Sequence, residues 1–569
     1  MSDPLRIALV QSDPTVGDVV GNVALIRTAR AEAAAAGAEL AVFSELMVCG
    51  YPPEDLIYRA AFLDAVAAAV EDLARDTADG GPALLIGAPW RGVGRGAGPD
   101  KARAHNAALL LDGGAIAAVR FKHHLPNYGV FDEQRVFAPG PAPGPMVFRG
   151  HRLGVMVCED MWFEDVAETL QESGAEILVV INGSPFESDK PDVRLSHAVA
   201  RIGETGLPLI YVNQVGGQDD LVFDGNSFVL NADRSLAAQL PAWRSALAVT
   251  TWTKSGRGLV CAPEPPSPAL DRLEHIYRAL MTGLGDYVRK NKFPGVVLGL
   301  SGGIDSALCA AVAVDALGPD RVHCIMMPSP YTSQDSLDDA AAVARLTGAR
   351  LDTIDIRPAM DAFAAMLGGH FAGTKPDITE ENLQSRARGV TLMALSNKFG
   401  KMVLATGNKS EMSTGYATLY GDMCGGYAVI KDVYKTTVFA LSRWRNAHRP
   451  EGALGPPGPV MPDRVITKPP TAELKHNQTD QDTLPPYDKL DDMLESLIDR
   501  QQSVAEVARR GHDPAVVGRV YRMLKAAEYK RRQAPPGVKI TGLAFGRDHR
   551  YPITNGFTDQ GSMSPGAPQ

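Results

Sequence analysis

The amino-acid sequence predicts an α/β chain of two domains, and two observations support this fold class. Short apolar runs of strand length alternate with Ala-rich helical patterns in both halves of the sequence. The chain is also 569 residues long, which is more than one hydrophobic core normally organises. Apolar residues make up 45% of it and charged residues 22%, as in ordinary globular enzymes.

The first domain is expected over residues 1–262 as a layered α/β structure. Its predicted strands are residues 6–11, 40–43, 83–88, 152–157, 176–181 and 209–213. Two hairpins are expected to turn at residues 112–114 and 231–233, where Asn, Asp and Gly favour tight turns. From residue 252 the composition shifts towards Pro, Ser and Gly, and residues 263–271 are expected to form an extended linker.

The second domain is expected over residues 272–545. Its predicted strands are residues 296–300, 323–327, 351–356 and 402–405, each followed by a helical pattern. This alternation implies a parallel, doubly wound sheet with a nucleotide site at the carboxyl ends of its strands. Segments 368–378 and 450–481 are rich in Gly and Pro and are expected to be loops or lids over that site. Residues 546–569 are expected to be a loose tail.

Charge and composition exclude several classes of function. The net charge of -9 argues against general binding to nucleic acid or to a membrane surface. The N-terminal apolar run is too short for a signal peptide, and no run approaches the length of a spanning helix, so a cytoplasmic location is expected. Six cysteines lie scattered without Cys-x-x-Cys spacing, which favours reduced thiols over disulfides or a zinc site.

The most informative motif is the hexapeptide Ser301-Gly302-Gly303-Ile304-Asp305-Ser306. It follows an apolar run and opens a helical segment at residues 307–317, so its backbone N–H groups and the helix dipole can hold an anion such as phosphate. The Lys followed by Ser or Thr of a kinase-type P-loop is absent. A carboxylate at Asp305 beside bound phosphates is unfavourable unless a cation lies between them, so it is interpreted as a Mg²⁺ ligand.

A second chemical centre is expected in the first domain around Cys158, which ends a predicted strand at a strand-to-helix corner. A thiol there can act as a nucleophile if a base or cation and a backbone N–H lie nearby. Cys158 alone is equally well interpreted as a buried structural cysteine. Glu45 and Lys122 also stand at the ends of predicted strands, which favours the catalytic interpretation of all three residues.

In that chain order, Glu45, Lys122 and Cys158 resemble the Glu-Lys-Cys triad of the nitrilase superfamily, and the resemblance covers roughly residues 5–260. It implies a four-layer α-β-β-α sandwich. It also implies that Cys158 attacks an amide carbon and that Glu45 takes and returns the proton. Lys122 and a backbone N–H near Glu159 then stabilise the tetrahedral oxyanion.

The chain also resembles a narrower family, the glutaminase domain of glutamine-dependent NAD⁺ synthetases, at residues 125–133 and at residues 182–186 with Lys190. This resemblance implies that Tyr128, Ser184 and Lys190 contact glutamine, and a cation at Lys190 suits the α-carboxylate of that substrate. The family often has Ala where Gly183 stands.

The triad needs no histidine, so His123 and His124 are expected to be surface or packing residues. Glu133 is interpreted either as a carboxylate that supports the triad or as a structural ion pair.

The Gly loop resembles that of the ATP pyrophosphatase superfamily, which implies a Rossmann-like adenine nucleotide α-hydrolase fold and the formation of AMP. Residues 381–388, 405–411 and 419–423 resemble the synthetase domain of the same NAD⁺ synthetase family in order and spacing. The ATP-binding residues that these resemblances imply are Gly299, Leu300, Ser301, Gly302, Gly303, Ile304, Asp305, Ser306, Thr406, Lys435 and Thr471, although the family often has Ser at the last position.

The same resemblance implies that Asn382, Glu411 and Lys530 bind deamido-NAD⁺ and that Asp305 and Glu411 hold Mg²⁺. No zinc, haem or flavin is expected.

Together these resemblances imply an ATP-dependent carbon–nitrogen ligase. Glutamine would be hydrolysed to glutamate and ammonia, deamido-NAD⁺ would be adenylated with release of pyrophosphate, and ammonia would convert the adenylate to NAD⁺ and AMP, the last step of NAD⁺ biosynthesis. An enclosed ammonia path from Cys158 to Ser301 is expected, because free ammonia is protonated in neutral water. The resemblance also implies a homo-oligomer built from dimers, such as an octamer, with no nucleic-acid or membrane partner.

Two other functions remain open at this stage. A GMP or asparagine synthetase shares the ATP loop, but its glutaminase uses a Cys-His-Glu triad or a cysteine at the mature N-terminus, and residue 2 here is Ser. An amidase fused to a degenerate nucleotide-binding sensor is the other possibility. Intact Asp305, Thr406 and Glu411 argue against it.

Overall fold

The chain divides into two units, Met1–Leu270 and Asp271–Gln569, according to its internal contacts. The structure is a computed structural model that describes residues 4–92, 104–255, 258–471, 473–475 and 478–559. Each unit has its own β-sheets and its own hydrophobic cores.

The first unit contains two large sheets. The seven-stranded sheet has the order β15-β14-β1-β2-β3-β4-β5. Its strands are β1 (Leu5–Gln11), β2 (Leu40–Val42), β3 (Ala83–Arg91), β4 (Ala104–Asp112), β5 (Ala115–Phe121), β14 (Ala246–Ser255) and β15 (Gly258–Cys261). The six-stranded sheet has the order β13-β12-β9-β8-β7-β6. Its strands are β6 (Met146–Phe148), β7 (His151–Val157), β8 (Ile177–Asn182), β9 (Leu209–Asn213), β12 (Phe228–Leu230) and β13 (Leu236–Gln239).

Among the described residues, this unit also has five α-helices and a small ribbon. The helices are α1 (Val19–Ala35), α2 (Ala60–Asp76), α3 (Glu133–Val136), α4 (Glu164–Glu172) and α5 (Lys190–Thr205). The ribbon pairs β10 (Val215–Gln218) with β11 (Leu221–Asp224).

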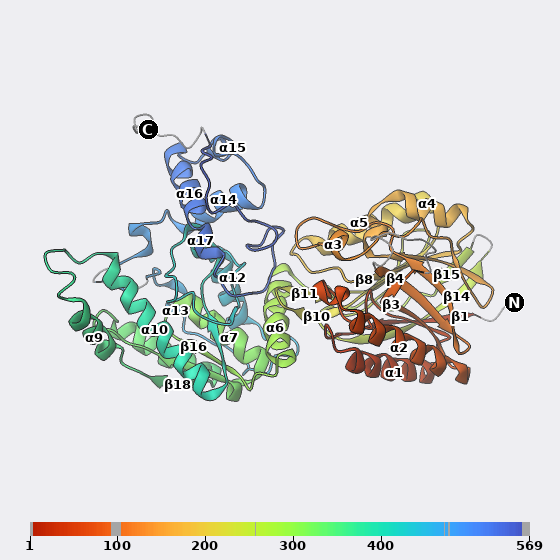
Figure 1. Ribbon diagram of the computed structural model, residues 1–569, viewed down its shortest axis with the longest axis horizontal. Helices are drawn as coiled ribbons and strands as arrows, with labels where there is room; N and C mark the ends of the chain where they lie inside the picture. Colours follow the sequence, from red (N-terminus) through yellow and green to blue (C-terminus); the bar gives the residue numbers. More distant parts are fainter. Residues whose placement is uncertain (1–3, 93–103, 256–257, 472, 476–477, 560–569) are drawn as a thin grey trace. The chain divides into compact units, whose positions relative to one another are not determined.

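The two large sheets pack face to face between two helical layers. Alternation along β1 explains the packing: Ile7 and Leu9 enter the core between the sheets, whereas Ala8 and Val10 enter the core beneath α1 and α2. A third core joins α4 and α5 to the outer face of the six-stranded sheet. Figure 1 shows α1 and α2 along one side of the sheets and α4 and α5 along the other. This α-β-β-α sandwich confirms the predicted fold of the first unit.

The second unit is built on a five-stranded sheet with the order β18-β17-β16-β19-β20, in which every pair is parallel. Its strands are β16 (Val296–Gly299), β17 (Val322–Met326), β18 (Arg350–Thr353), β19 (Met402–Ala405) and β20 (Tyr427–Ala428). Because the chain runs outwards from β16 in both directions, the sheet is doubly wound, as predicted, with its switch point between β16 and β19.

Twelve α-helices are described in this unit. They are α6 (Arg272–Lys290), α7 (Ile304–Leu317), α8 (Gln334–Thr347), α9 (Arg357–Leu367), α10 (Ile378–Phe399), α11 (Lys409–Thr414), α12 (Lys435–Ala447), α13 (Asp463–Thr467), α14 (Tyr487–Ile498), α15 (Val504–Arg509), α16 (Pro514–Ala526) and α17 (Glu528–Arg531). In the part of the chain that the structure describes, no helix combines the length and the apolarity that crossing a bilayer requires.

Two features of the strands differ from the sequence predictions. Strands β14 and β15, which end at Cys261, are not among the predicted strands, and they pair with each other in an antiparallel ladder. Strand β18 ends at Thr353, before the predicted residue 356.

The loose tail expected from residue 546 is wrong for residues 546–559. Asp548 forms a buried ion pair with Lys539 at 3.0 Å, and the Asp559 carboxylate accepts a hydrogen bond from the Val504 N–H at 3.0 Å. The rest of the expected tail, residues 560–569, lies outside the described residues.

Candidate active sites

The three residues of the predicted triad follow three strands of the first unit. Glu45 follows β2, Lys122 follows β5, and Cys158 follows β7 and opens a 3₁₀ turn. Gly87 on β3 lets the Glu45 loop approach closely, because a Cβ there would lie 2.2 Å from the Leu46 nitrogen.

Cys158 has a φ of +47°, a backbone conformation that few non-Gly residues adopt and that is concentrated at functional sites.

The Lys122 ammonium lies between two buried carboxylates. Its Nζ donates to Glu45 Oε1 at 2.7 Å and to Glu133 Oε1 at 2.8 Å, and both Lys122 and Glu45 have no exposed surface. Asn106 Nδ2 donates to Glu45 Oε1 at 2.6 Å, and the Gly183 N–H donates to Glu45 Oε2 at 2.8 Å. Buried charges are tolerated when they are paired and hydrogen-bonded in this way. Glu133 is therefore a direct partner of the triad lysine.

Burial and these contacts shift the pKa values of Cys158, Lys122 and Glu133. Burial and then Glu45 raise the pKa of the Cys158 thiol well above its ordinary value, while Lys122 acts in the opposite direction. Burial alone would lower the pKa of Lys122, but Glu133 and Glu45 raise it well above its usual range. Burial also raises the pKa of Glu133 to about 7. The resting site therefore holds a neutral thiol beside a charged ammonium, so attack by sulfur requires that a base remove the thiol proton.

Asp160 holds the Lys122 segment against the Cys158 corner, a role that sequence reasoning missed. Its Oδ2 accepts from the Val157 N–H at 3.0 Å, and its Oδ1 accepts from the N–H groups of His123 at 3.0 Å and His124 at 2.9 Å. One buried carboxylate thus joins the strand that carries the nucleophile to the segment that carries the cation. The position of Asp160 next to the corner gave no sequence signal for this long-range contact.

Two of the three predicted glutamine contacts gather near the carboxylate of Glu159. Tyr128 Oη donates to this carboxylate at 3.0 and 3.1 Å, and Lys190 acts with Tyr128 and Lys122 to oppose the rise that burial causes in the Glu159 pKa. Sequence reasoning used only the backbone N–H of Glu159 and missed its side chain. Ser184 is buried, and its Oγ accepts from Arg194 Nε at 3.1 Å. Nothing described joins Ser184 directly to Tyr128 or Lys190.

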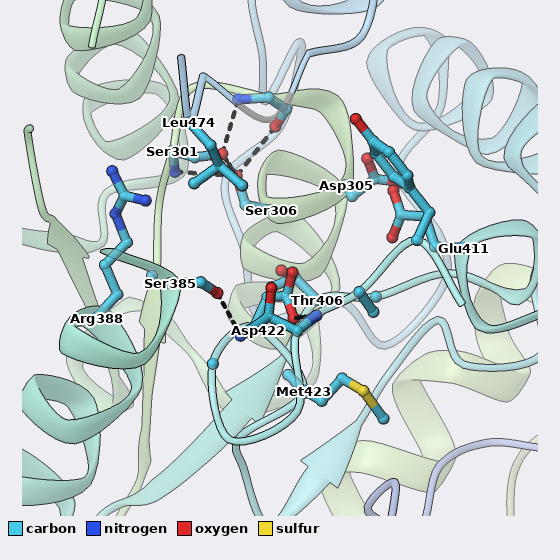
Figure 2. A pocket seen from close by; sticks show the side chains of 18 of the residues that line it. Ser301, Asp305, Ser306, Ser385, Arg388, Thr406, Glu411, Asp422, Met423 and Leu474 are labelled. Atoms are coloured by element: carbon cyan, nitrogen blue, oxygen red, sulfur yellow. Dashed lines mark hydrogen bonds between the residues drawn. The ribbon is translucent and has the colours of Figure 1, made fainter. Parts of the chain in front are cut away.

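The second site is a cavity of about 510 Å³ at the carboxyl ends of β16 and β19, the switch point of the doubly wound sheet. All the predicted nucleotide residues except Gly302 line it, and Figure 2 shows several of their side chains around it. Gly302 supports the loop instead. Its φ is +80°, and a Cβ there would lie 2.3 Å from the Ser336 carbonyl oxygen, so only glycine fits.

The Gly loop is held by its own hydroxyl groups. Ser306 Oγ accepts from the Ser301 N–H at 3.2 Å and donates to the Gly303 carbonyl at 3.0 Å. Helix α7 begins at Ile304, and its N-cap, Gly303, provides no side-chain cap. The positive end of a 14-residue helix therefore faces the cavity, which suits phosphate.

One ammonium is shared by two carboxylates in this cavity as well. Lys435 pairs with Asp305 and lies 3.6 Å from Glu411, and Asn408 Nδ2 donates to Asp305 Oδ1 at 2.9 Å. Burial and the charge of Asp305 raise the pKa of Glu411 to about 8, against the effect of Lys435. Two repelling carboxylates with one cation between them suit a divalent ion, and their hard oxygen atoms are the ligands that Mg²⁺ prefers. Asp305 and Glu411 therefore fit the predicted metal.

The other predicted contacts of this cavity are already bonded to protein. Lys530 Nζ donates to the carbonyls of Gly415 at 2.7 Å and Ala417 at 2.6 Å. Thr471 Oγ1 donates to the Gln478 carbonyl at 2.6 Å, and Asn382 Oδ1 accepts from Thr418 Oγ1 at 3.2 Å. A ligand that takes up these groups must exchange the existing bonds.

Several charged residues of the cavity received no role from the sequence, among them Arg388, Lys468 and Asp480. Burial lowers the pKa of Arg388 to about 10, and Lys468 Nζ lies 2.8 Å from Asp339 Oδ2. Asp480 is buried, and its Oδ1 has no hydrogen-bond partner among the described residues. Lys468, Thr471 and Asp480 belong to the segment 450–481, so this part of the chain does line the site, as expected of a lid.

Comparisons with known proteins match both units. A family model described as Carbon-nitrogen hydrolase matches residues 6–256, and one described as NAD synthase matches residues 276–534. With the two sites above, this defines an enzyme in which an amide-hydrolysing unit precedes a nucleotide-dependent synthase unit. The chain belongs to the glutamine-dependent NAD(+) synthetase family. The predicted class of enzyme, an ATP-dependent ligase, is confirmed by this membership.

Full-length relatives support that assignment. A glutamine-dependent NAD(+) synthetase from Rhodobacter capsulatus is 49% identical over 98% of this chain and 100% of its own length. One from Xanthomonas campestris is 46% identical over 98% of both chains. The solved structure of the enzyme from Acinetobacter baumannii in complex with ADP is 40% identical, with a TM-score of 0.77 over 98% of this chain and 100% of that chain.

The protonation of Cys158 can be tested by titration. The Cys158 thiol is expected to ionise above the usual range for cysteine. Glu45→Gln should lower that pKa, because it removes the carboxylate whose charge raises it most. The thiolate absorbance in the ultraviolet measures this, with Cys158→Ala as the blank. A Glu45→Gln variant whose Cys158 ionises at the same or a higher pH would contradict the electrostatics described here.

Proposed function

We propose that this chain synthesises NAD⁺ from deamido-NAD⁺, ATP and glutamine, with the two reactions divided between its units. The observation that carries the proposal is the pair of sites described above. One unit has a buried carboxylate–ammonium pair beside a strand-end cysteine, and the other has a phosphate-binding loop with two carboxylates in one cavity. Membership of the family supports the same division.

In the first unit, Cys158 attacks the amide carbon of glutamine while Glu45 takes the thiol proton. The oxyanion that forms is stabilised by the Lys122 ammonium and by the backbone N–H of Glu159. Glu45 returns the proton to the leaving ammonia and then activates the water that hydrolyses the thioester. The bonds to Asn106 and Gly183 keep the Glu45 carboxylate in one orientation through both steps.

Glutamine is recognised by charges of both signs. Lys190 binds the α-carboxylate, and Glu159, which Tyr128 orients, binds the α-ammonium. Ser184, the second residue after β8, contacts the substrate in this proposal. The Arg194 bond to Ser184 fixes that hydroxyl.

In the second unit, the N–H groups of the Gly loop and the start of α7 bind the phosphates of ATP. The carboxylate of deamido-NAD⁺ attacks the α-phosphate and displaces pyrophosphate, and ammonia then converts the adenylate to NAD⁺ and AMP. Asp305 and Glu411 would hold Mg²⁺, which neutralises charge on the phosphates. Lys435 moves from these carboxylates to the phosphates when the nucleotide binds. Asn382, Lys530, Thr406 and Thr471 complete the nucleotide contacts.

Three finer points belong to the same proposal. Ammonia is transferred through an enclosed path, since protonation in bulk water would remove its nucleophilicity. The chain acts as a cytoplasmic homo-oligomer built from dimers. Its partners are small-molecule substrates rather than nucleic acid or membranes, in keeping with a net charge of -9.

Replacing Cys158 should separate the two nitrogen sources. The Cys158→Ala variant is expected to lose glutamine-driven synthesis by at least ~10³-fold while ammonium-driven synthesis stays close to that of the unchanged chain. NAD⁺ and AMP are measured with each nitrogen source. Cys261→Ala, which removes another buried thiol of the same unit, is the matched control. Retained use of glutamine by Cys158→Ala would disprove the nucleophile, and formation of ADP in place of AMP would disprove the synthetase reaction.

Replacing Lys435 should impair synthesis and leave glutamine hydrolysis intact. Because Lys435 is expected to bind the transferring phosphates, Lys435→Met should lower kcat for synthesis by ~10²–10³-fold with either nitrogen source. Hydrolysis of glutamine to glutamate should survive, because that chemistry belongs to the other unit. Lys398→Met changes an exposed lysine of the same unit and serves as the control. Equal synthesis by Lys435→Met and Lys398→Met would exclude a catalytic role for Lys435.

A further inference from the structure

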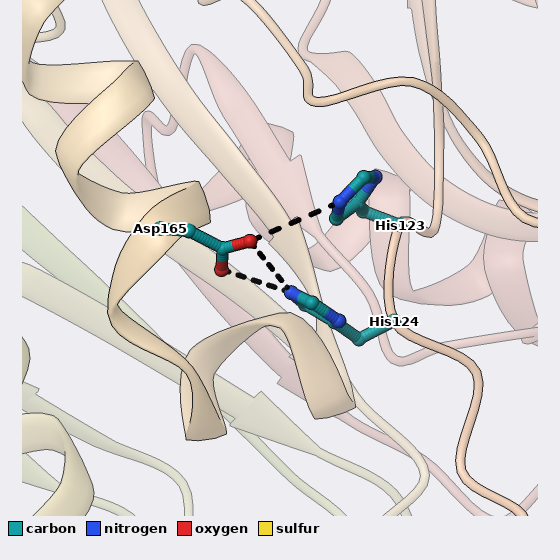
Figure 3. A group of neighbouring side chains, drawn as sticks. All are labelled: His123, His124 and Asp165. Carbon is teal, nitrogen blue, oxygen red and sulfur yellow. Dashed lines mark hydrogen bonds and ion pairs between the residues drawn. The ribbon is translucent and has the colours of Figure 1, made fainter.

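We propose that His123, His124 and Asp165 form a binding site for a transition-metal dication such as Zn²⁺ in the first unit. The ligand atoms of these three side chains all lie within 4.8 Å of one another. Figure 3 shows both imidazole rings directed at the same carboxylate. Two imidazoles and one carboxylate are a common protein ligand set for zinc, with remaining positions filled by water. The sequence had predicted no zinc, and it treated both histidines as surface or packing residues.

The distances fit a single ion between the three groups. His124 Nε2 lies 2.9 Å from Asp165 Oδ1, and His123 Nε2 lies 3.9 Å from Asp165 Oδ2. Ligands bound at ~2.0 Å in a tetrahedral site are separated by a little over 3 Å, which lies between these two values. The site can therefore form by small side-chain movements.

The tautomer of His123 is the second reason to expect a cation. His123 Nδ1 lies 2.8 Å from the carbonyl oxygen of Gly140, which can only accept a hydrogen bond, so Nδ1 carries the proton. In the neutral ring this leaves the lone pair of Nε2 facing the Asp165 carboxylate. Two acceptors face each other favourably only when a second proton or a metal ion lies between them. A backbone carbonyl that orients the ring from Nδ1 is also the usual support of a metal-binding histidine.

The backbone around the three residues is already ordered. The N–H groups of His123 and His124 both donate to the buried Asp160, and the His124 ring packs against Phe163 with 4.2 Å between ring centroids. Asp165 stands in the first turn of α4, close behind the Cys158 corner. Little conformational entropy remains to be lost when an ion binds, which favours affinity.

The location gives the ion a structural effect. His123 and His124 directly follow Lys122, whereas Asp165 belongs to the helix that follows Cys158. A bound ion would join the segment that carries the triad lysine to the segment that carries the nucleophile, in parallel with Asp160. It would stabilise the first unit without entering the glutaminase reaction. The side chains keep 25 to 55% of their surface exposed, so the ion can enter from solvent.

Titration with Co²⁺ alone, followed by competition with Zn²⁺, tests this site. The full chain with Cys158→Ala is used, because that variant lacks the catalytic thiol as a competing ligand, and excess Mg²⁺ occupies the carboxylates of the second unit. One Co²⁺ per chain should give visible bands of nitrogen and oxygen ligation without a thiolate charge-transfer band. His124→Gln and Asp165→Asn should each weaken binding by at least ~100-fold. His197→Gln and Asp192→Asn are the matched controls.

Thermal unfolding gives a second measurement on the same proteins. Zn²⁺ should raise the unfolding midpoint of the Cys158→Ala chain and of both control variants, because an ion that binds only the folded state stabilises it. It should leave the midpoint of the His124→Gln variant unchanged. If His124→Gln fails to fold, His123→Gln replaces it. Equal affinity in the site variants and the controls, or a thiolate band in the Co²⁺ spectrum, would overturn the proposal and leave these residues as a histidine–aspartate ion pair.

Discussion

A buried lysine shared by two carboxylates organises the first unit. Removing one partner of a buried charge pair typically costs ~3–5 kcal/mol. The segments after β2 and β5 that carry Glu45 and Lys122 are therefore held strongly to the short helix α3, which begins at Glu133. The same arrangement places the Glu45 carboxylate near a thiol whose pKa burial raises well above its ordinary value. The reactivity of Cys158 therefore depends on the shared lysine and its two carboxylates.

The second unit also contains a lysine that is shared by two carboxylates. Lys435 lies between Asp305 and Glu411, and all three residues line the cavity of the second unit. Both lysines are buried, so exposure does not distinguish them. The difference is that Lys435 lines the cavity where the nucleotide is proposed to bind.

Much of the fold was predictable because its signals are local. Apolar runs between Gly-rich turns located most of the central strands, and the motif at residues 301–306 marked the nucleotide loop, in which Gly302 has a φ of +80°. Strands β14 and β15 were missed because Pro, Ser and Gly nearby suggested a linker, whereas pairing with β1 decides their structure. Among the residues missed in the sites, Asp160 and the Glu159 side chain have partners more than 30 positions away, His123 and Tyr128. No local pattern encodes such contacts.

Formation of the glutamyl thioester on Cys158 tests the central role of the shared lysine most directly. Rapid quenching during turnover with glutamine, followed by mass spectrometry of the Cys158 peptide, measures it in the unchanged chain, in Lys122→Met and in Lys254→Met, which alters a half-exposed lysine of the same unit. The account predicts the thioester in the unchanged chain and in Lys254→Met. It predicts none in Lys122→Met, although Cys158 is still present there. Thioester formation at an unchanged rate in Lys122→Met would contradict it.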